Sequence, residues 1–235
     1  MWGKNSNGQL GLGKRSAEVV PLPTKVDCLD GITIKMVALG SEHSMAVTDG
    51  GEALSWGIGD SGRLGHDHDS GILGFFKSTS EYTPRLIKNL EGIKVKNAAA
   101  GLLHSACIDE NGSVFVFGES AVDKVGFGKV NNATAQFMIS ELPYSEEMYL
   151  IYPKEFKVSC GWKHTAAISE GNIFTWGWGG SHGTFSEDGH SSGGQLGHGS
   201  DVDYIKPTMV TFEGNVKALQ ISCGFNHTGA ILECT

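Results

Sequence analysis

The eight residues GWKHTAAI (residues 161–168) belong to a pattern that the chain repeats four times. The other copies read GSEHSMAV (residues 40–47), GLLHSACI (residues 101–108) and GFNHTGAI (residues 224–231). Each copy begins with a glycine and carries one histidine: Gly40 and His43, Gly101 and His104, Gly161 and His164, Gly224 and His227. The glycines lie 61, 60 and 63 residues apart. Self-similarity at one period is the signature of a repeat architecture, and the unit here is about 60 residues long.

Two further landmarks recur in the same order. An aromatic–glycine pair follows the histidine by 12 or 13 positions in three units: Trp56–Gly57, Phe117–Gly118 and Trp176–Gly177. Trp2–Gly3 is the same pair without the upstream half of its unit. A Gly-x-Leu-Gly sequence comes next at residues 8–11, 62–65 and 194–197, whereas the third unit has only VGFG at residues 125–128. We therefore expect one domain over residues 1–235, with units of about 2–55, 56–116, 117–175 and 176–235.

Each unit carries three strand signals. Small and branched residues follow each histidine, as in a strand that is packed on both faces. A turn such as Asn111–Gly112 then leads into a second strand that ends at the aromatic–glycine pair. Alternating lysines and apolar residues mark a third strand before each glycine, for example at residues 34–38 and 216–221. The pattern predicts an all-β propeller of antiparallel blades with three to four strands, in which the histidine strands lie nearest the centre.

Composition narrows the function classes. The chain has 34 glycines and 40% hydrophobic residues, which is typical of a folded, turn-rich protein. Its 18 basic and 26 acidic residues give a net charge of −8 without a basic run, so we expect no direct nucleic-acid partner. Five cysteines without a CxxC pair predict neither a disulfide framework nor a zinc knuckle. No apolar run reaches the length of a membrane span, and we expect a nuclear or cytoplasmic protein.

The candidate sites favour structural roles. The four histidines could suggest a metal, but equivalent residues of successive blades spread around an axis, so we predict that they are buried and hydrogen-bonded to backbone. The segment His66-Asp67-His68-Asp69 is the one compact ligand cluster, and a solvated loop is the favoured interpretation. The glycine-rich stretches lack the Gly-Lys-Ser/Thr ending of a phosphate-binding loop, and no nucleophile elbow occurs. We expect no catalytic, cofactor or metal site, and assign the repeat glycines, histidines and aromatic residues to the framework.

The quoted segments, together with WGKNSNGQLGLG (residues 2–13), resemble the repeats of the regulator of chromosome condensation family. The resemblance covers essentially the whole chain and implies a propeller that usually has seven blades, of which about four are present here. Residues 161–165 also resemble plant members related to a UV-B receptor. We expect a partial ring, and we expect the 235-residue chain alone to aggregate, oligomerise or melt below a version restored with upstream repeats.

The resemblance favours a noncatalytic scaffold for a protein partner. The alternatives are guanine-nucleotide exchange on a Ran-like GTPase, as in the founding member, and association with chromatin or histones. UV-B reception is disfavoured because Ser41, Leu102 and Phe225 stand where Trp162 stands, and Lys163 replaces arginine. Partner contacts are expected from the insertions at residues 66–81, 129–150 and 179–193, of which residues 131–150 could form a short helix. The candidate partner-binding residues are Trp162, Lys163, Tyr144, Glu146 and Glu147.

Overall fold

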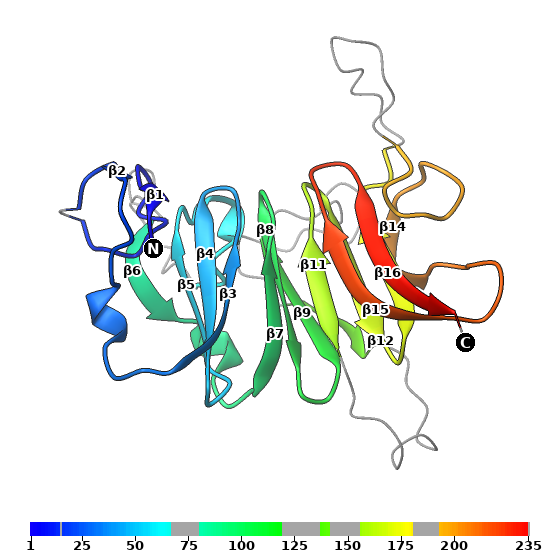
Figure 1. The fold of residues 1–235 in the computed structure, drawn as a ribbon, viewed down its shortest axis with the longest axis horizontal. Helices are drawn as coiled ribbons and strands as arrows, with labels where there is room; N and C mark the ends of the chain where they lie inside the picture. Colours follow the sequence, from blue (N-terminus) through cyan, green and yellow to red (C-terminus); the bar gives the residue numbers. More distant parts are fainter. Residues whose placement is uncertain (15, 67–79, 119–136, 142–155, 181–192, 235) are drawn as a thin grey trace, which may run out of the picture.

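The computed structural model of the chain is an arc of antiparallel β-sheets (Figure 1). It describes residues 1–14, 16–66, 80–118, 137–141, 156–180 and 193–234. Three sheets have four strands each and are referred to below as blades 1, 2 and 3; a two-stranded sheet lies at either end of the arc. Among the described residues the only helical elements are three 3-10 turns: η1 (Asp27–Leu29), η2 (Asp60–Gly62) and η3 (Lys88–Leu90). The predicted all-β propeller architecture is confirmed.

The strands follow the chain in order. The N-terminal pair is β1 (Gly3–Lys4) and β2 (Val19–Val20), and the C-terminal pair is β15 (Val216–Cys223) and β16 (Thr228–Cys234). Blade 1 consists of β3 (Ile34–Leu39), β4 (His43–Thr48), β5 (Ala53–Gly57) and β6 (Glu81–Leu86). Blade 2 consists of β7 (Val95–Ala100), β8 (His104–Asp109), β9 (Ser113–Gly118) and β10 (Phe137–Glu141). Blade 3 consists of β11 (Lys157–Cys160), β12 (His164–Ser169), β13 (Asn172–Gly177) and β14 (Tyr204–Met209).

The histidine strand is the second strand of each blade, so the prediction that it lies nearest the centre is wrong. β4 pairs with β3 on one side and with β5 on the other. In the same way, β8 lies between β7 and β9, and β12 lies between β11 and β13. The first strands of adjacent blades contact one another, β3 with β7 and β7 with β11. These first strands therefore form the inner edge, where the blades converge. All six residues of each histidine strand are buried. Their side chains are mostly small because both faces of the strand are covered by neighbouring sheets.

A fourth strand completes each blade at its outer edge, and the sequence patterns above did not identify it. It contains Pro84 in β6 and Pro207 in β14. Proline lacks an N–H donor and is tolerated mainly where a strand forms the edge of a sheet. In blade 2 the fourth strand, β10, lies within the insertion for which a short helix was considered, so that expectation is wrong for residues 137–141. Pairing with the open edge of β9 decides the conformation there.

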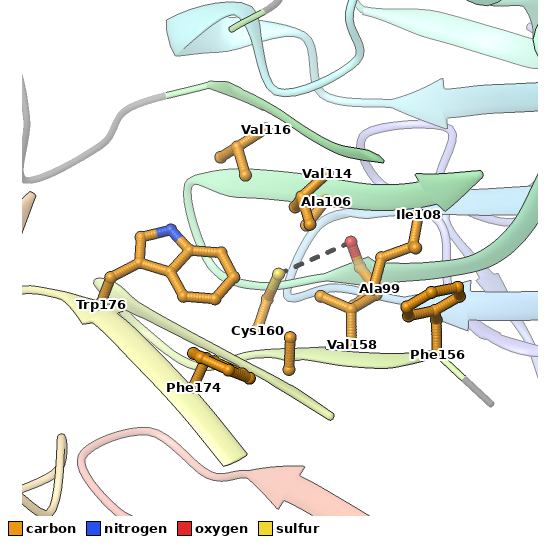
Figure 2. Close-up of a cluster of buried hydrophobic side chains, with 11 residues drawn as sticks. Ala99, Ala106, Ile108, Val114, Val116, Phe156, Val158, Cys160, Phe174 and Trp176 are labelled. Atoms are coloured by element: carbon orange, nitrogen blue, oxygen red, sulfur yellow. Dashed lines mark hydrogen bonds between the residues drawn. The ribbon is translucent and has the colours of Figure 1, made fainter. Parts of the chain in front are cut away.

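Apolar clusters between blades hold the arc together. Figure 2 shows the cluster between blades 2 and 3, to which blade 2 contributes Ile108 and Val114 and blade 3 contributes Phe174 and Trp176. A second cluster, which includes Met45 and Phe117, joins blades 1 and 2. Cys160 is buried in the first cluster, and its thiol lies 3.8 Å from the Ala99 carbonyl oxygen. No helix among the described residues is long and apolar enough to cross a membrane.

Candidate functional site

The repeat histidines link each blade to the next. His43, His104 and His164 are 1%, 3% and 1% exposed, which confirms the predicted burial. Their Nε2 atoms lie 2.8, 3.0 and 3.0 Å from hydroxyl oxygens of the following sheet: Ser105 for His43, Thr165 for His104 and Thr228 for His164. The prediction of a backbone partner is therefore wrong for these three nitrogens. The hydroxyl belongs to the residue that follows the next repeat histidine, so one sequence pattern supplies both sides of the contact.

The hydrogen bonds of these hydroxyl groups determine that the histidine Nε2 atoms carry a hydrogen. Ser105 donates its hydrogen to the Arg63 carbonyl at 2.8 Å, so its oxygen must accept from His43 Nε2–H. Thr228 likewise donates to the Gln195 carbonyl and accepts from His164. Burial is the main cause that lowers the pKa of His43 to about 3 and the pKa of His164 to about 4. The rings are therefore neutral donors at physiological pH, which suits a framework contact and not proton transfer.

The glycines permit close approach at the start of the histidine strand, beside the histidine itself. Gly57, Gly118 and Gly177 have φ values of +103°, +106° and +106°, a region that side chains rarely adopt. A Cβ atom at Gly57 would collide with the backbone of Glu42 and His43, and one at Gly40 would collide with the His43 ring. Close packing and backbone conformation therefore explain why glycine stands at these repeat positions. The part of the chain that the structure describes contains no group of three or more His, Cys, Asp or Glu side chains that could hold a metal ion.

His66 is a buried framework residue, so the interpretation of its segment as a solvated loop is wrong at this position. Its ring is 4% exposed, and Nε2 lies 3.0 Å from the Ser55 hydroxyl. His198 repeats this contact with Thr175 in blade 3 at 2.9 Å. The signal was available in the sequence, because both histidines directly follow a Gly-x-Leu-Gly segment. Residues 67–69 of the cluster lie outside the described residues.

An aromatic cluster distinguishes the C-terminal part of the arc from the rest. Trp162 stacks on Phe225 with ring centroids 4.6 Å apart, and Trp178 meets Trp162 edge-on at 5.5 Å. The Lys163 ammonium lies 4.9 Å from the centroid of the Trp162 ring. Phe225 is 56% exposed, Trp162 and Lys163 are half-buried, and Trp178 is buried. The cluster thus combines an accessible pair of stacked rings with a nearby cation. The buried Trp178 packs against the edge of this pair through Trp162.

The framework places the cluster through backbone hydrogen bonds between sheets. The Trp162 N–H donates to the Phe225 carbonyl at 3.1 Å, and the Ser41 N–H donates to the carbonyl of the next repeat glycine, Gly101, at 3.1 Å. The residues that follow the repeat glycines therefore lie at the same end of successive sheets, one after another along the arc. Ser41 and Leu102 fill this position in blades 1 and 2, so only its last two occurrences are aromatic.

Two of the five candidate partner-binding residues, Trp162 and Lys163, fall in this cluster. Tyr144, Glu146 and Glu147 lie outside the described residues, as do most of the three insertions. Phe225 and Trp178 were not among the candidates. The repeat alignment could have indicated Phe225, which occupies the Trp162 position of the next unit. Trp178 follows an aromatic–glycine pair where Ile58 stands in blade 1, so no repeat landmark marks it.

Repeated four-stranded antiparallel blades with buried inter-blade histidines define a β-propeller-type repeat protein. The model of the Regulator of chromosome condensation (RCC1) repeat matches residues 1–47, 50–108 and 189–231. The chain belongs to this family. A second model of the same repeat matches residues 34–63.

Known relatives are longer than the chain. The Ultraviolet-B receptor UVR8 of Arabidopsis thaliana is 33% identical over 233 residues, a match that covers 99% of this chain and 46% of the receptor. The probable E3 ubiquitin-protein ligase HERC4 of Homo sapiens is 34% identical over 220 residues, which is 92% of this chain and 18% of the ligase. The chain thus spans less than half of these two relatives.

Two solved structures share the fold over nearly the whole chain. Human WBSCR16 has a TM-score of 0.71 and 26% identity, and the match covers 100% of this chain and 52% of that protein. Prp20p of Saccharomyces cerevisiae, described with its binding to Gsp1p and histones, has a TM-score of 0.64 at 20% identity. The match to Prp20p covers 97% of this chain and 50% of Prp20p. The arc therefore corresponds to about half of each of these two structures.

Proposed function

We propose that the chain is a noncatalytic protein-interaction scaffold of the nucleus or cytoplasm. The observation that carries the proposal is the stacked Trp162–Phe225 pair with Lys163 above it, held on a framework that leaves these side chains accessible. Tryptophan and other large aromatic side chains supply much of the binding energy at protein interfaces. The repeat histidines are neutral, buried and engaged between blades, so they are poorly suited to catalysis.

The chemistry of the cluster favours a protein partner over nucleic acid. Stacked aromatic rings with one nearby cation suit an apolar side chain flanked by a carboxylate. Phosphate binding would instead require several basic groups, and the chain carries a net charge of −8. We expect Tyr144, Glu146 and Glu147 to contribute to partner binding as well, because they belong to an insertion that lengthens its repeat unit.

Exchange activity and histone binding are the alternatives. Prp20p is described as binding Gsp1p and histones, which makes a Ran-like GTPase and histones the first probes to use. We do not propose UV-B reception, although UVR8 is a relative. Only one of the four equivalent repeat positions carries tryptophan, and a lysine follows it.

The test measures partner capture and nucleotide release separately. Wild-type chain is used to capture proteins from its native source, beside Trp162→Ala/Phe225→Ala and a control, Met209→Ala, which removes an equally accessible apolar side chain from β14. We expect the double variant to lose a partner that wild type and control both retain. A Ran-like GTPase loaded with fluorescent nucleotide should not release it faster when the chain is added. Faster release would replace the scaffold proposal with exchange, and equal capture by all three proteins would refute the aromatic site.

A further inference from the structure

The three four-stranded blades carry three kinds of side chain at one repeat position. The residue directly before the repeat histidine is Glu42 in blade 1, Leu103 in blade 2 and Lys163 in blade 3. The carbonyls of Glu42 and Lys163 accept hydrogen bonds from the residues after the aromatic–glycine pairs, at 3.0 and 2.8 Å. The blades follow one another along the arc (Figure 1). One end of the arc therefore presents a carboxylate, an aliphatic side chain and an ammonium in that order.

The Glu42 carboxylate has room for a further cation. Its side chain is 35% exposed, and its contacts with the Asn7 amide at 3.0 Å and the Lys4 ammonium at 3.8 Å both reach Oε1. Within the described part of the chain, Oε2 makes no hydrogen bond or ion pair. The Lys4 side chain is 68% exposed, and a long surface ion pair of this kind is weak. A basic group of a partner can therefore bind Oε2 without displacing Asn7.

The Lys163 ammonium is available to an acidic group. It lies 4.9 Å from the centroid of the Trp162 ring, a contact that positions the side chain but does not neutralise its charge. The ion pairs among the described residues do not include Lys163. The residue is half-buried, so salt screens its attraction for a bound carboxylate less than it would at a fully exposed lysine. Lys163 therefore provides the cationic end of this surface.

Two leucines of blade 2 lie between the charged positions. Leu102 and Leu103 are both partly exposed. The Leu102 N–H donates to the Gly161 carbonyl of blade 3 at 3.4 Å. The Leu102 carbonyl accepts from the buried Arg63 guanidinium at 2.9 Å. These bonds attach the leucine pair to the sheets on either side, so it forms a fixed apolar surface between the carboxylate and the ammonium.

The separation of the charged positions sets the length of a matching ligand. Facing sheets pack about 10 Å apart, so equivalent positions of blades 1 and 3 are about 20 Å apart. An extended peptide advances about 3.3 Å per residue, so about six residues cover this distance. Two charged residues at that spacing can therefore reach Glu42 and Lys163 together. The residues between them then lie over the leucine pair.

We infer that this surface binds an extended segment of a partner protein in which a basic and an acidic residue are about six positions apart. The basic residue pairs with Glu42, the acidic residue pairs with Lys163, and apolar residues between them pack on Leu102 and Leu103. The opposite charges fix the direction of the segment, because the reversed direction would place like charges together at both ends. The inference rests on the proposed scaffold function and defines the class of segment that the scaffold binds.

The test measures the binding of two short fluorescein-labelled peptides by fluorescence anisotropy. One peptide has an arginine and a glutamate about six positions apart with leucines between them, and the other has the same composition with the two charges adjacent. Wild type should bind the first peptide at least about fivefold more tightly, because the second satisfies only one charged position. Glu42→Lys and Lys163→Glu should each weaken binding of the first peptide at least about fivefold. The double variant should bind it as wild type does, because reversal of the peptide restores both ion pairs.

The control variants make the same charge changes at the opposite end of blade 2. Glu110→Lys and Lys94→Glu alter exposed residues beside the end of β8 and the start of β7, and both should bind the peptides as wild type does. Leu103→Ala should weaken binding of both peptides, because it removes the apolar contact. Far-ultraviolet circular dichroism establishes that each variant is folded.

Three results would overturn the inference. These are equal binding of the two peptides by wild type, unchanged binding by both single charge variants, and a double variant that does not regain binding. Sedimentation that shows self-association of wild type, lost in both single charge variants, would assign the surface to a second copy and would also overturn it. The scaffold function would survive any of these results if Trp162→Ala/Phe225→Ala still lost its captured partner.

Discussion

At the scale of the residue, one hydroxyl group joins three parts of the structure. Ser105 accepts from His43 of blade 1 and donates to the Arg63 carbonyl, while its own strand belongs to blade 2. The same arrangement joins His164, Thr228 and Gln195. Because His43 and Ser105 are both buried, loss of the Ser105 hydroxyl leaves the His43 Nε2–H without an acceptor in a buried site.

Replacement of this hydroxyl should therefore be costly. Ser105→Ala should lower the free energy of unfolding by about 1–3 kcal/mol, because His43 Nε2–H loses its acceptor in a buried site. Urea denaturation at neutral pH measures the loss. Thr24→Ala removes an exposed hydroxyl that bonds only a nearby backbone oxygen, and it should change stability little. Equal effects of the two substitutions would contradict the argument.

The histidines also predict how stability depends on pH. Burial, the main cause in each case, lowers the folded-state pKa to about 3 for His43 and about 4 for His104 and His164. Unfolded histidine titrates near pH 6.5, so the unfolded chain binds more protons below that pH. Stability should be greatest above pH 6.5 and should fall as the pH drops toward 4. Each histidine adds a slope of up to about 1.4 kcal/mol per pH unit.

Urea midpoints between pH 7 and pH 5 measure this slope above the range in which most carboxylates titrate. His104→Gln, which cannot take up a proton, should make the curve less steep even though it lowers stability at pH 7. If this substitution left the slope unchanged, His104 would not contribute to the dependence of stability on pH.

At the scale of the element, the aromatic–glycine pair marks the end of the third strand in each complete blade. Gly57 lies opposite His43 in the sheet, and the equivalent glycines lie opposite His104 and His164. The positive φ at these glycines turns the chain away from the histidine strand. The next residue can then donate its N–H to the carbonyl before the histidine, as Trp178 does to Lys163 at 2.8 Å.

Gly57→Ala should be strongly destabilising for two separate reasons. Alanine at φ +103° is strained, and its Cβ would collide with backbone atoms of Glu42 and His43. Gly92→Ala is the matched control, because Gly92 has a φ of +81° with nothing within 4 Å of the added Cβ. The control should lose about 1–2 kcal/mol from strain alone, and Gly57→Ala should lose more. Thermal denaturation of both variants tests the order, and a larger loss for Gly92→Ala would contradict it.

At the scale of the whole molecule, stability comes from contacts between successive blades. The cluster of Figure 2 contains side chains from both blade 2 and blade 3, so neither blade buries it alone. Each blade contacts its neighbours along the arc, and repeat proteins of this kind share stability between adjacent units.

A core substitution in one blade should therefore loosen the next. Ile108→Ala in blade 2 should lower the free energy of unfolding by about 2–5 kcal/mol, because a fully buried side chain leaves a cavity. Hydrogen exchange should show faster exchange of amides in β11 and β12 as well as in blade 2. Ile32→Ala, at a 43% exposed position, is the control and should leave blade 3 unchanged. Changes confined to blade 2 would show that the blades unfold independently.

The sequence alone predicted the repeat unit, three of the four strands in each blade and the burial of His43, His104 and His164. These features follow from the repeat period and from side-chain alternation along a strand, which are local properties. The fourth strand escaped prediction because a proline-containing edge strand is short of apolar alternation, although Pro84 and Pro207 recur at equivalent places.

The tertiary structure decided which groups meet across blades. The partner of His43 lies 62 residues away, and the stacking of Trp162 on Phe225 joins separate sheets. The burial of His66 depends on its contact with the Ser55 hydroxyl of the neighbouring strand β5, which lies 11 residues away in the sequence. Such contacts depend on how far each sheet is rotated and displaced from its neighbour. That geometry arises from packing between blades, and no pattern within a single repeat specifies it.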